Sequence, residues 1–96
     1  MAKYDLRGKT AVITGASTGI GRELSRCFAA EGSNLVLGCH PSQKDILHRW
    51  AAELANSYGV RVSGLPIDLA DSSGPEGFYD SVKRTVDRVD VLVNNA

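Results

Sequence analysis

Four short apolar runs divide the chain, and the intervals between them repeat their apolar residues at helical spacing. The runs cover residues 10–14, 34–38, 60–67 and 89–96. The first run, TAVIT, is rich in β-branched residues and has no interruption, which is typical of a strand buried on both faces. The alternation of strand and helix therefore predicts a single α/β unit. Its parallel sheet of four strands would carry three helices on its two faces, joined by right-handed crossovers.

The spacing of apolar residues also predicts where each helix begins and ends. Gly32 ends the first helix, whose apolar positions are Ile20, Leu24, Cys27 and Phe28. Ser42 and Asp45 begin the second helix, because their spacing lets each side chain bond the other's backbone N–H. Gly59 ends that helix, and its apolar stripe is Ile46, Trp50 and Leu54. The third helix begins near Pro75 and repeats its apolar residues at Phe78, Val82 and Val86.

Three glycines separate the first strand from the first helix, in the stretch TGASTGIG at residues 14–21. Glycine accepts a positive φ and lets a ligand touch the backbone. The first N–H groups of a helix have no internal partner, so they bind an anion without help from a lysine. Ligands of such sheets bind beyond the carboxyl ends of the strands. We therefore expect Gly15, Gly19 and Gly21 to accommodate a dinucleotide pyrophosphate; the alternative is a tight turn without a ligand.

Two other phosphate-binding patterns fit this stretch less well. A P-loop ends in Gly-Lys-Ser/Thr, whereas Ile20 follows Gly19 and Arg22 follows Gly21. The common dinucleotide pattern G-x-G-x-x-G is not met either, because the spacing here is G-x-x-x-G-x-G.

Residues 14–21 resemble the T-G-x-x-x-G-x-G signature of the short-chain dehydrogenase/reductase family. Asp68, which follows the third strand, resembles the family's aspartate beside the adenine ring, and residues 94–96 resemble the start of its N-N-A-G motif. The three motifs stand in the family's order, and the resemblance covers the whole chain. It implies the N-terminal half of a Rossmann-type doubly wound parallel sheet, with residues 1–96 as one dinucleotide-binding domain.

The resemblance also implies that the family's cofactor, NAD(H) or NADP(H), is bound here. Asp68 would accept a hydrogen bond from the adenine amino group, with Leu69 giving backbone contact; a loop cap is the alternative. Asn95 and Ala96 would lie near the nicotinamide ribose while Asn94 ties strands together, or the asparagines are turn residues. The residues expected around the pyrophosphate and ribose are Gly15, Ser17, Thr18, Gly19, Ile20 and Gly21.

The end of the second strand bears on the choice of cofactor. NAD sites usually place an acidic residue there to bind the ribose 2′-hydroxyl, but residues 38–41 read Gly-Cys-His-Pro. Asp45 is better used in the helix cap. Without a carboxylate to repel it, a 2′-phosphate can bind, and we predict NADP(H) over NAD(H), with Cys39 and His40 at the site.

The predicted 2′-phosphate site uses hydroxyl and imidazole donors. His40 could donate to the phosphate, supported by hydroxyls of Ser17, Thr18 and Ser42. The sequence departs here from NADP-preferring relatives, which often carry basic residues at the positions of His40 and Thr18. A solvated loop histidine is the alternative for His40.

The residues that perform hydride transfer in the family, a serine, a Tyr-x-x-x-Lys pair and an asparagine, all follow the N-N-A-G motif. Tyr79 and Lys83 match Y-x-x-x-K in letters, but we expect them one turn apart on a helix surface before the fourth strand. No catalytic residue is assigned. The chain is interpreted as the cofactor-binding half of an oxidoreductase acting on a carbonyl or alcohol, truncated before the catalytic half and inactive alone. The alternatives are a non-catalytic nucleotide-binding or regulatory module and a scaffold with a vacant pocket.

The balance of charged residues bears on which classes of partner the protein binds. Eleven basic residues balance 11 acidic ones, which gives no support to a nucleic-acid or anionic-membrane partner. The sequence shows no signal-peptide core and no long apolar run, so we expect a cytoplasmic protein. Cys27 and Cys39 lack metal-site spacing and are expected to be reduced and at least half-buried, with no metal site. The apolar VLV edge of the fourth strand invites pairing with another chain, so a homo-oligomer is expected.

Overall fold

The computed structural model describes residues 6–67 and 74–95, so Asp68, Leu69 and Ala96 lie outside the described residues. Strands and helices alternate along the described ranges, as the sequence predicts. In chain order the elements are β1 (Thr10–Ile13), α1 (Gly19–Ala30), β2 (Asn34–Cys39), the 3₁₀ turn η1 (Pro41–Gln43), α2 (Lys44–Tyr58), β3 (Val62–Pro66), α3 (Gly74–Thr85) and β4 (Val91–Val93).

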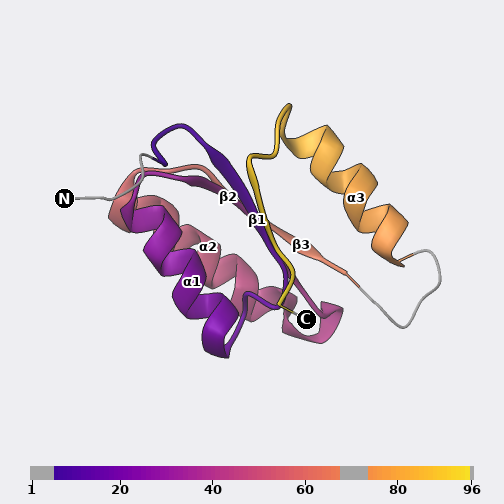
Figure 1. The fold of residues 1–96 in the computed structure, drawn as a ribbon. Helices are drawn as coiled ribbons and strands as arrows, with labels where there is room; N and C mark the ends of the chain where they lie inside the picture. Colours follow the sequence, from indigo (N-terminus) through magenta and orange to yellow (C-terminus); the bar gives the residue numbers. More distant parts are fainter. Residues whose placement is uncertain (1–5, 68–73, 96) are drawn as a thin grey trace.

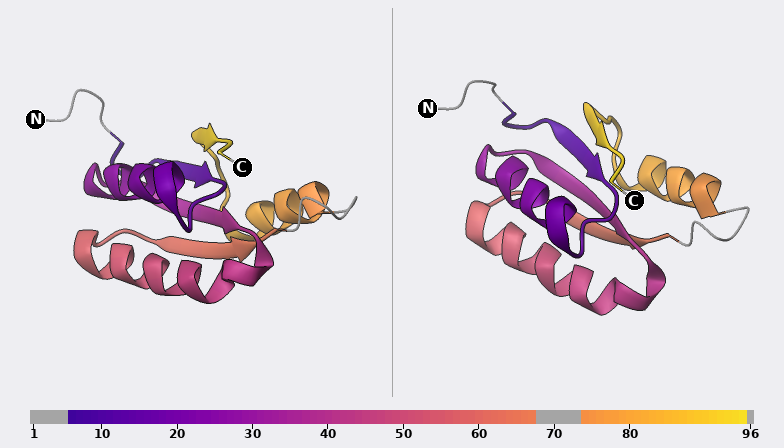
Figure 2. Two further views of the ribbon diagram at one scale, coloured as in Figure 1. Left: turned by 90° about the horizontal axis from the view of Figure 1, so that it is seen from below. Right: turned by 60° about the horizontal axis from the view of Figure 1, so that its bottom comes forward.

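The four strands form one parallel sheet in the order β3-β2-β1-β4. The chain steps outward from β1 to β2 and β3, then returns to the other side of β1 for β4, so the strand order reverses at β1. Helices α1 and α2 cover one face of the sheet, and α3 lies on the other (Figure 1). Figure 2 shows the same separation of α3 from the α1–α2 pair in two further views. The predicted fold class, the N-terminal half of a doubly wound sheet, is confirmed.

The two central strands are buried on both faces, which is what their uninterrupted apolar runs predict. Successive side chains of a strand point to opposite faces, so β1 and β2 contribute to two cores. The core on the α1–α2 face includes Ala11, Ile13, Leu35, Leu37, Trp50 and Leu54. The core on the α3 face includes Val12, Val36, Ile67, Phe78 and Val82.

The first helix ends where the sequence predicts. Gly32 adopts a φ of +85° directly after the C-cap residue Glu31, and the Ser33 N–H donates to the Phe28 carbonyl at 3.1 Å. Cys27, however, is exposed on α1, so its expected burial is wrong. The predicted apolar positions of this helix also omitted Ser25 and Ala29, which lie on its buried face.

The start of the second helix differs from the sequence prediction. Ser42 lies inside η1, where its backbone N–H donates to His40 Nδ1 at 3.1 Å, so no reciprocal cap with Asp45 forms. Ile46 is 42% exposed, because the face toward the sheet is one residue further round the helix. The buried residues of α2 are Leu47, Trp50, Ala51 and Leu54, which recur at intervals of three or four.

Candidate functional site

The glycine turn, residues 14–18 with the first turn of α1, lies at the carboxyl end of β1, beside the reversal of strand order (Figure 1). Gly15 and Gly19 have φ values of +62° and +59°, in the left-handed region where glycine avoids strain. The Ala16 N–H donates to the Gly38 carbonyl at 3.0 Å, which fastens the turn to the end of β2. The two positive φ values and this hydrogen bond therefore set the shape of the turn.

The outer two glycines of the turn are needed for packing within the protein. A Cβ atom on Gly15 would overlap the backbone carbonyl of Asn95, with only 3.0 Å to the carbonyl carbon. A Cβ atom on Gly21 would lie 2.8 Å from the carbonyl carbon of Gly15 and 2.7 Å from Asn95 Nδ2. These two positions lack side chains because the turn, helix α1 and Asn95 meet there.

The middle glycine has a different surrounding. A Cβ atom on Gly19 would meet no other atom within 4 Å, so this part of the turn faces open space. Next to it, Ile20 is 71% exposed. The open side of Gly19 is where the backbone can be approached from outside, which is the property that a phosphate ligand requires.

Helix α1 begins at this open side, and the N–H groups of its first turn, which carry the partial positive charge of the helix dipole, have no partner among the described residues. The backbone N–H groups of Gly19, Ile20 and Gly21 form no hydrogen bond with another described residue, and the first helical bond runs from the Arg22 N–H to the Thr18 carbonyl at 3.3 Å. The N-cap residue, Thr18, makes no side-chain cap, and the first turn of α1 contains no acidic residue. These N–H groups, together with the helix dipole, are suited to binding an anion.

The two asparagines after β4 meet the glycine turn through Thr14. The Thr14 hydroxyl donates to Asn94 Oδ1 at 3.1 Å and accepts from the Asn95 N–H at 3.0 Å. Asn94 therefore ties the end of β4 to the end of β1, as the sequence predicts. Asn95 lies at the base of the turn, between Gly15 and Gly21, so two motifs about 80 residues apart form one structure.

The end of β2 supplies the third side of the site. The Cys39 side chain is buried in the core of the α1–α2 face, and burial raises the pKa of its thiol. His40 is exposed, with its Nδ1 turned back to cap η1 through the Ser42 N–H. The structure thus brings Gly15, Ser17, Thr18, Gly19, Ile20, Gly21, Cys39, His40 and Asn95 to the carboxyl ends of β1, β2 and β4.

Gln43 joins the loops after β1 and β2, and the sequence prediction missed it. The side chain of Ser17 is almost fully buried, and its hydroxyl donates to Gln43 Oε1. Gln43 belongs to no sequence motif. The available signal was its position in the short segment after β2, which has to pack beside the glycine turn.

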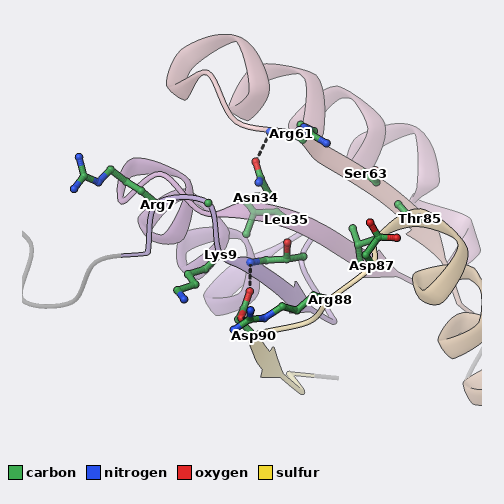
Figure 3. Close-up of a pocket in the computed structure, with 13 residues that line it drawn as sticks. Arg7, Lys9, Asn34, Leu35, Arg61, Ser63, Thr85, Asp87, Arg88 and Asp90 are labelled. Carbon is green, nitrogen blue, oxygen red and sulfur yellow. Dashed lines mark hydrogen bonds and ion pairs between the residues drawn. The ribbon is translucent and has the colours of Figure 1, made fainter.

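A hollow of about 380 Å³ lies at the opposite, amino-terminal ends of the strands, away from the glycine turn (Figure 3). Several of its polar groups are paired with one another. Asp90 Oδ2 accepts from the Thr10 N–H at 2.9 Å, its Oδ1 lies 2.7 Å from Arg88 Nε, and Asn34 Oδ1 accepts from the Arg61 N–H at 3.0 Å. The Thr10 N–H is the main cause that lowers the pKa of Asp90. This end of the sheet has the character of a stabilising network.

The Tyr79–Lys83 pair lies on the surface of α3, as predicted. Tyr79 is 61% exposed, and the Lys83 ammonium stands 5.4 Å from the centre of its ring. A smaller apolar hollow of about 200 Å³ lies between α3 and the sheet, next to Tyr79 and the exposed Leu92. The pair belongs to this face of the sheet, where Tyr79 lines the same hollow as Thr14.

Within the described ranges, no helix combines the length and apolar character needed to cross a bilayer. The same ranges contain no group of three or more histidine, cysteine or acidic side chains placed to hold a metal ion.

Comparison with known proteins adds independent evidence. A family model described as short chain dehydrogenase matches residues 9–96. Oxidoreductase UcpA of Salmonella typhimurium (strain LT2) is 41% identical over 91 residues, which are 95% of this chain and 33% of that protein. L-Sorbose reductase from Gluconobacter frateurii, solved in complex with NADPH and L-sorbose, gives a TM-score of 0.87 at 42% identity, covering 95% of this chain and 34% of that one. A short-chain dehydrogenase from Sphingobium yanoikuyae in complex with NADPH gives 0.81 at 36% identity, covering 92% and 34%.

The sheet order and the glycine turn at its reversal define the N-terminal half of a Rossmann-type fold. Because the family model matches nearly all of the sequence, the chain belongs to the short-chain dehydrogenase family. It spans about a third of the length of the relatives it matches.

Proposed function

We propose that this chain binds a nicotinamide dinucleotide, NADP(H) in preference to NAD(H), and is the cofactor-binding part of a reductase or dehydrogenase. One observation carries the proposal: the N–H groups of Gly19, Ile20 and Gly21, at the open side of the glycine turn, have no partner among the residues that the structure describes. Both of the solved relatives described above bind NADPH, which supports the same ligand class here.

The residues present fit the pyrophosphate of such a cofactor. The missing Cβ atom of Gly19 lets a phosphate approach, and the N–H groups at the start of α1 point to the same side. No acidic residue in the first helical turn competes for these donors. When bound, the nicotinamide ring supplies or accepts a hydride, and the residues of the turn hold the cofactor in place for that exchange.

The two ends of the dinucleotide would lie on either side of the turn. The nicotinamide ribose would lie near Asn95 and Ala96, because Asn95 is fixed at the base of the turn by Thr14. The adenine would lie toward the end of β2, with Asp68 and Leu69 as its proposed contacts. This direction follows from the strand order, since β4 and β2 flank β1 on opposite sides.

The preference for NADP(H) rests on the loop after β2. The described residues 38–43 contain no carboxylate that would repel a 2′-phosphate. His40 is exposed and uses Nδ1 in capping η1, so its Nε2 is directed away from that cap. We further propose that residues 1–96 form the dinucleotide-binding domain of a homo-oligomeric enzyme whose substrate is a small carbonyl or alcohol.

Calorimetric titration of the protein with NADPH and NADH tests the proposal, using Gly19→Ala and the matched control Gly59→Ala. Both glycines have a positive φ, +59° and +68°, and both face open space, so both variants carry a similar strain of about 1–2 kcal/mol. Only the Cβ atom at position 19 stands where the phosphate would bind. We expect at least a tenfold loss of NADPH affinity in Gly19→Ala and little change in Gly59→Ala. A well-folded protein that binds neither nucleotide at millimolar concentration would contradict the proposal.

A further inference from the structure

The contact between Ser17 and Gln43 places a side-chain amide at the edge of the proposed cofactor site. Ser17 belongs to the glycine turn after β1, and Gln43 ends the 3₁₀ turn η1 after β2. The two strands are parallel neighbours with Ile13 opposite Leu37, so the loops that follow them lie side by side. The Ser17 hydroxyl, in a side chain only 3% exposed, donates to Gln43 Oε1 and links these loops.

In the structure the Gln43 amide turns its oxygen toward Ser17. Its oxygen is occupied by Ser17, so its NH₂ group points away from that hydroxyl. In the described part of the chain Gln43 makes no second side-chain hydrogen bond, and no buried side-chain nitrogen lacks a partner. The NH₂ group of Gln43 is therefore reachable from outside, with two hydrogens free to donate.

The neighbouring histidine is oriented in the same way. His40 Nδ1 accepts from the Ser42 N–H at 3.1 Å, so in this tautomer the ring hydrogen is on Nε2. The nearest cation after the turn is directed elsewhere, because the Arg22 guanidinium is stacked 3.9 Å from the centre of the Trp50 ring. The loop after β2 thus presents N–H donors from His40 and Gln43, directly before the exposed Lys44 at the start of α2.

We propose that Gln43 is a specificity-determining residue, whose amide NH₂ donates to the 2′-phosphate of NADP(H) while Ser17 holds the amide in that orientation. This inference rests on the proposed function. A phosphate oxygen accepts hydrogen bonds, so it suits a side chain that directs its N–H donors outward. The 2′-hydroxyl of NAD(H) can accept from the same NH₂ group, but a hydrogen bond to a charged phosphate is stronger, so the phosphate gains more from this donor.

The variant Gln43→Glu tests the orientation and the charge together. One carboxylate oxygen can still accept from Ser17, and the other replaces the NH₂ group with an acceptor that repels phosphate. We expect NADPH affinity to fall at least tenfold while NADH affinity is unchanged or rises, so the NADPH/NADH affinity ratio falls by tenfold or more. The control Asn56→Asp adds the same charge at an exposed position near the other end of α2 and should leave both affinities unchanged.

Two further variants keep the inference testable if Gln43→Glu unfolds. Gln43→Met keeps the length of the side chain without its donor and should lower NADPH affinity about threefold to tenfold, with NADH affinity unchanged. Ser17→Ala releases the amide and should lower the same ratio by a smaller factor. Calorimetry with 2′-phospho-AMP and AMP as probes isolates the adenosine end from catalysis.

The outcomes separate this inference from the proposed function. If the wild-type protein binds both dinucleotides and neither Gln43 variant changes their affinity ratio, the role of Gln43 is wrong and the proposed function stands. If the folded wild-type protein binds neither dinucleotide, the proposed function itself fails.

Discussion

The two ends of the sheet are both rich in polar groups, but the two sets of groups differ in whether they have hydrogen-bond partners. At the amino ends of the strands, Asp90 is bonded to the Thr10 N–H and to Arg88 around a hollow of about 380 Å³ (Figure 3). At the carboxyl ends, the first N–H groups of α1 have no partner among the described residues. The hollow of about 380 Å³ is therefore at the end where several polar groups are already paired. Unpaired donors locate the candidate site better than cavity size does.

The glycines at the carboxyl ends show the same distinction on a smaller scale. Gly15 and Gly21 are surrounded by protein atoms, whereas Gly19 faces open space. A signature of three glycines thus combines two positions that the fold needs and one, Gly19, that we propose a ligand approaches. Substitutions at the two kinds of position should fail for different reasons.

The largest effect is expected from Gly21→Ala. Its Cβ atom would overlap the carbonyl of Gly15 and lie 2.7 Å from Asn95 Nδ2, and backbone atoms there have little freedom to move. We expect a loss of about 3 kcal/mol or more in the free energy of unfolding, measured by urea denaturation. Wild-type stability in this variant would show that the turn can relax, and would weaken the distinction from Gly19.

An intermediate effect is expected from Thr14→Val, which removes the hydroxyl that joins β1 to the asparagines after β4. Both hydrogen bonds of the hydroxyl are lost, so the free energy of unfolding should fall by about 1–2 kcal/mol and NADPH affinity should fall with it. The matched control is Thr85→Val at the amino end, where the hydroxyl only bonds the Ser81 carbonyl of its own helix at 2.7 Å. Equal losses of affinity in the two variants would contradict a special role for Thr14.

The smallest effect at neutral pH is expected from Asp90→Asn. This variant should be recognised by how its stability difference from wild type changes with pH. The Thr10 N–H, with help from Arg88 and Lys9, lowers the pKa of Asp90, while burial opposes them. A carboxyl group whose pKa is lower in the folded state stabilises above its unfolded pKa of about 3.9 and loses that contribution as pH falls through the folded value. The stability difference between wild type and variant should therefore shrink below about pH 4, while NADPH affinity at pH 7 stays unchanged. A difference that does not vary with pH would contradict this.

The sequence predicted the parts of the molecule that depend on local pattern. The α/β alternation, the glycine turn and the end of α1 at Gly32 follow from periodicity and backbone preference, which act over a few residues. The joining of Asn94 to β1 was predicted through the family resemblance, and the structure gives it a physical basis in the Thr14 hydroxyl.

The buried face of α2 and the contact of Gln43 depend on distant segments, whereas the predicted cap of α2 was lost to a local alternative. Ile46 fits a helical stripe as well as Leu47 does, and only the position of α2 on the sheet decides which is buried. The Ser42–Asp45 cap does not form because Ser42 lies inside η1 and its N–H donates to His40 Nδ1 instead. Gln43 depends on the meeting of two loops 26 residues apart, which no local pattern describes.

Asn95, at the base of the glycine turn, is 81 residues from the hydroxyl of Thr14 that holds it. During synthesis on a ribosome the glycine signature emerges early. Asn95 can occupy the base of the turn only after β4 has been made and has docked. Nucleotide would then bind tightly only to chains in which β4 is in place, and by mass action it would favour those chains over incompletely folded ones. The cofactor would in this way act as a check on assembly as well as a reagent.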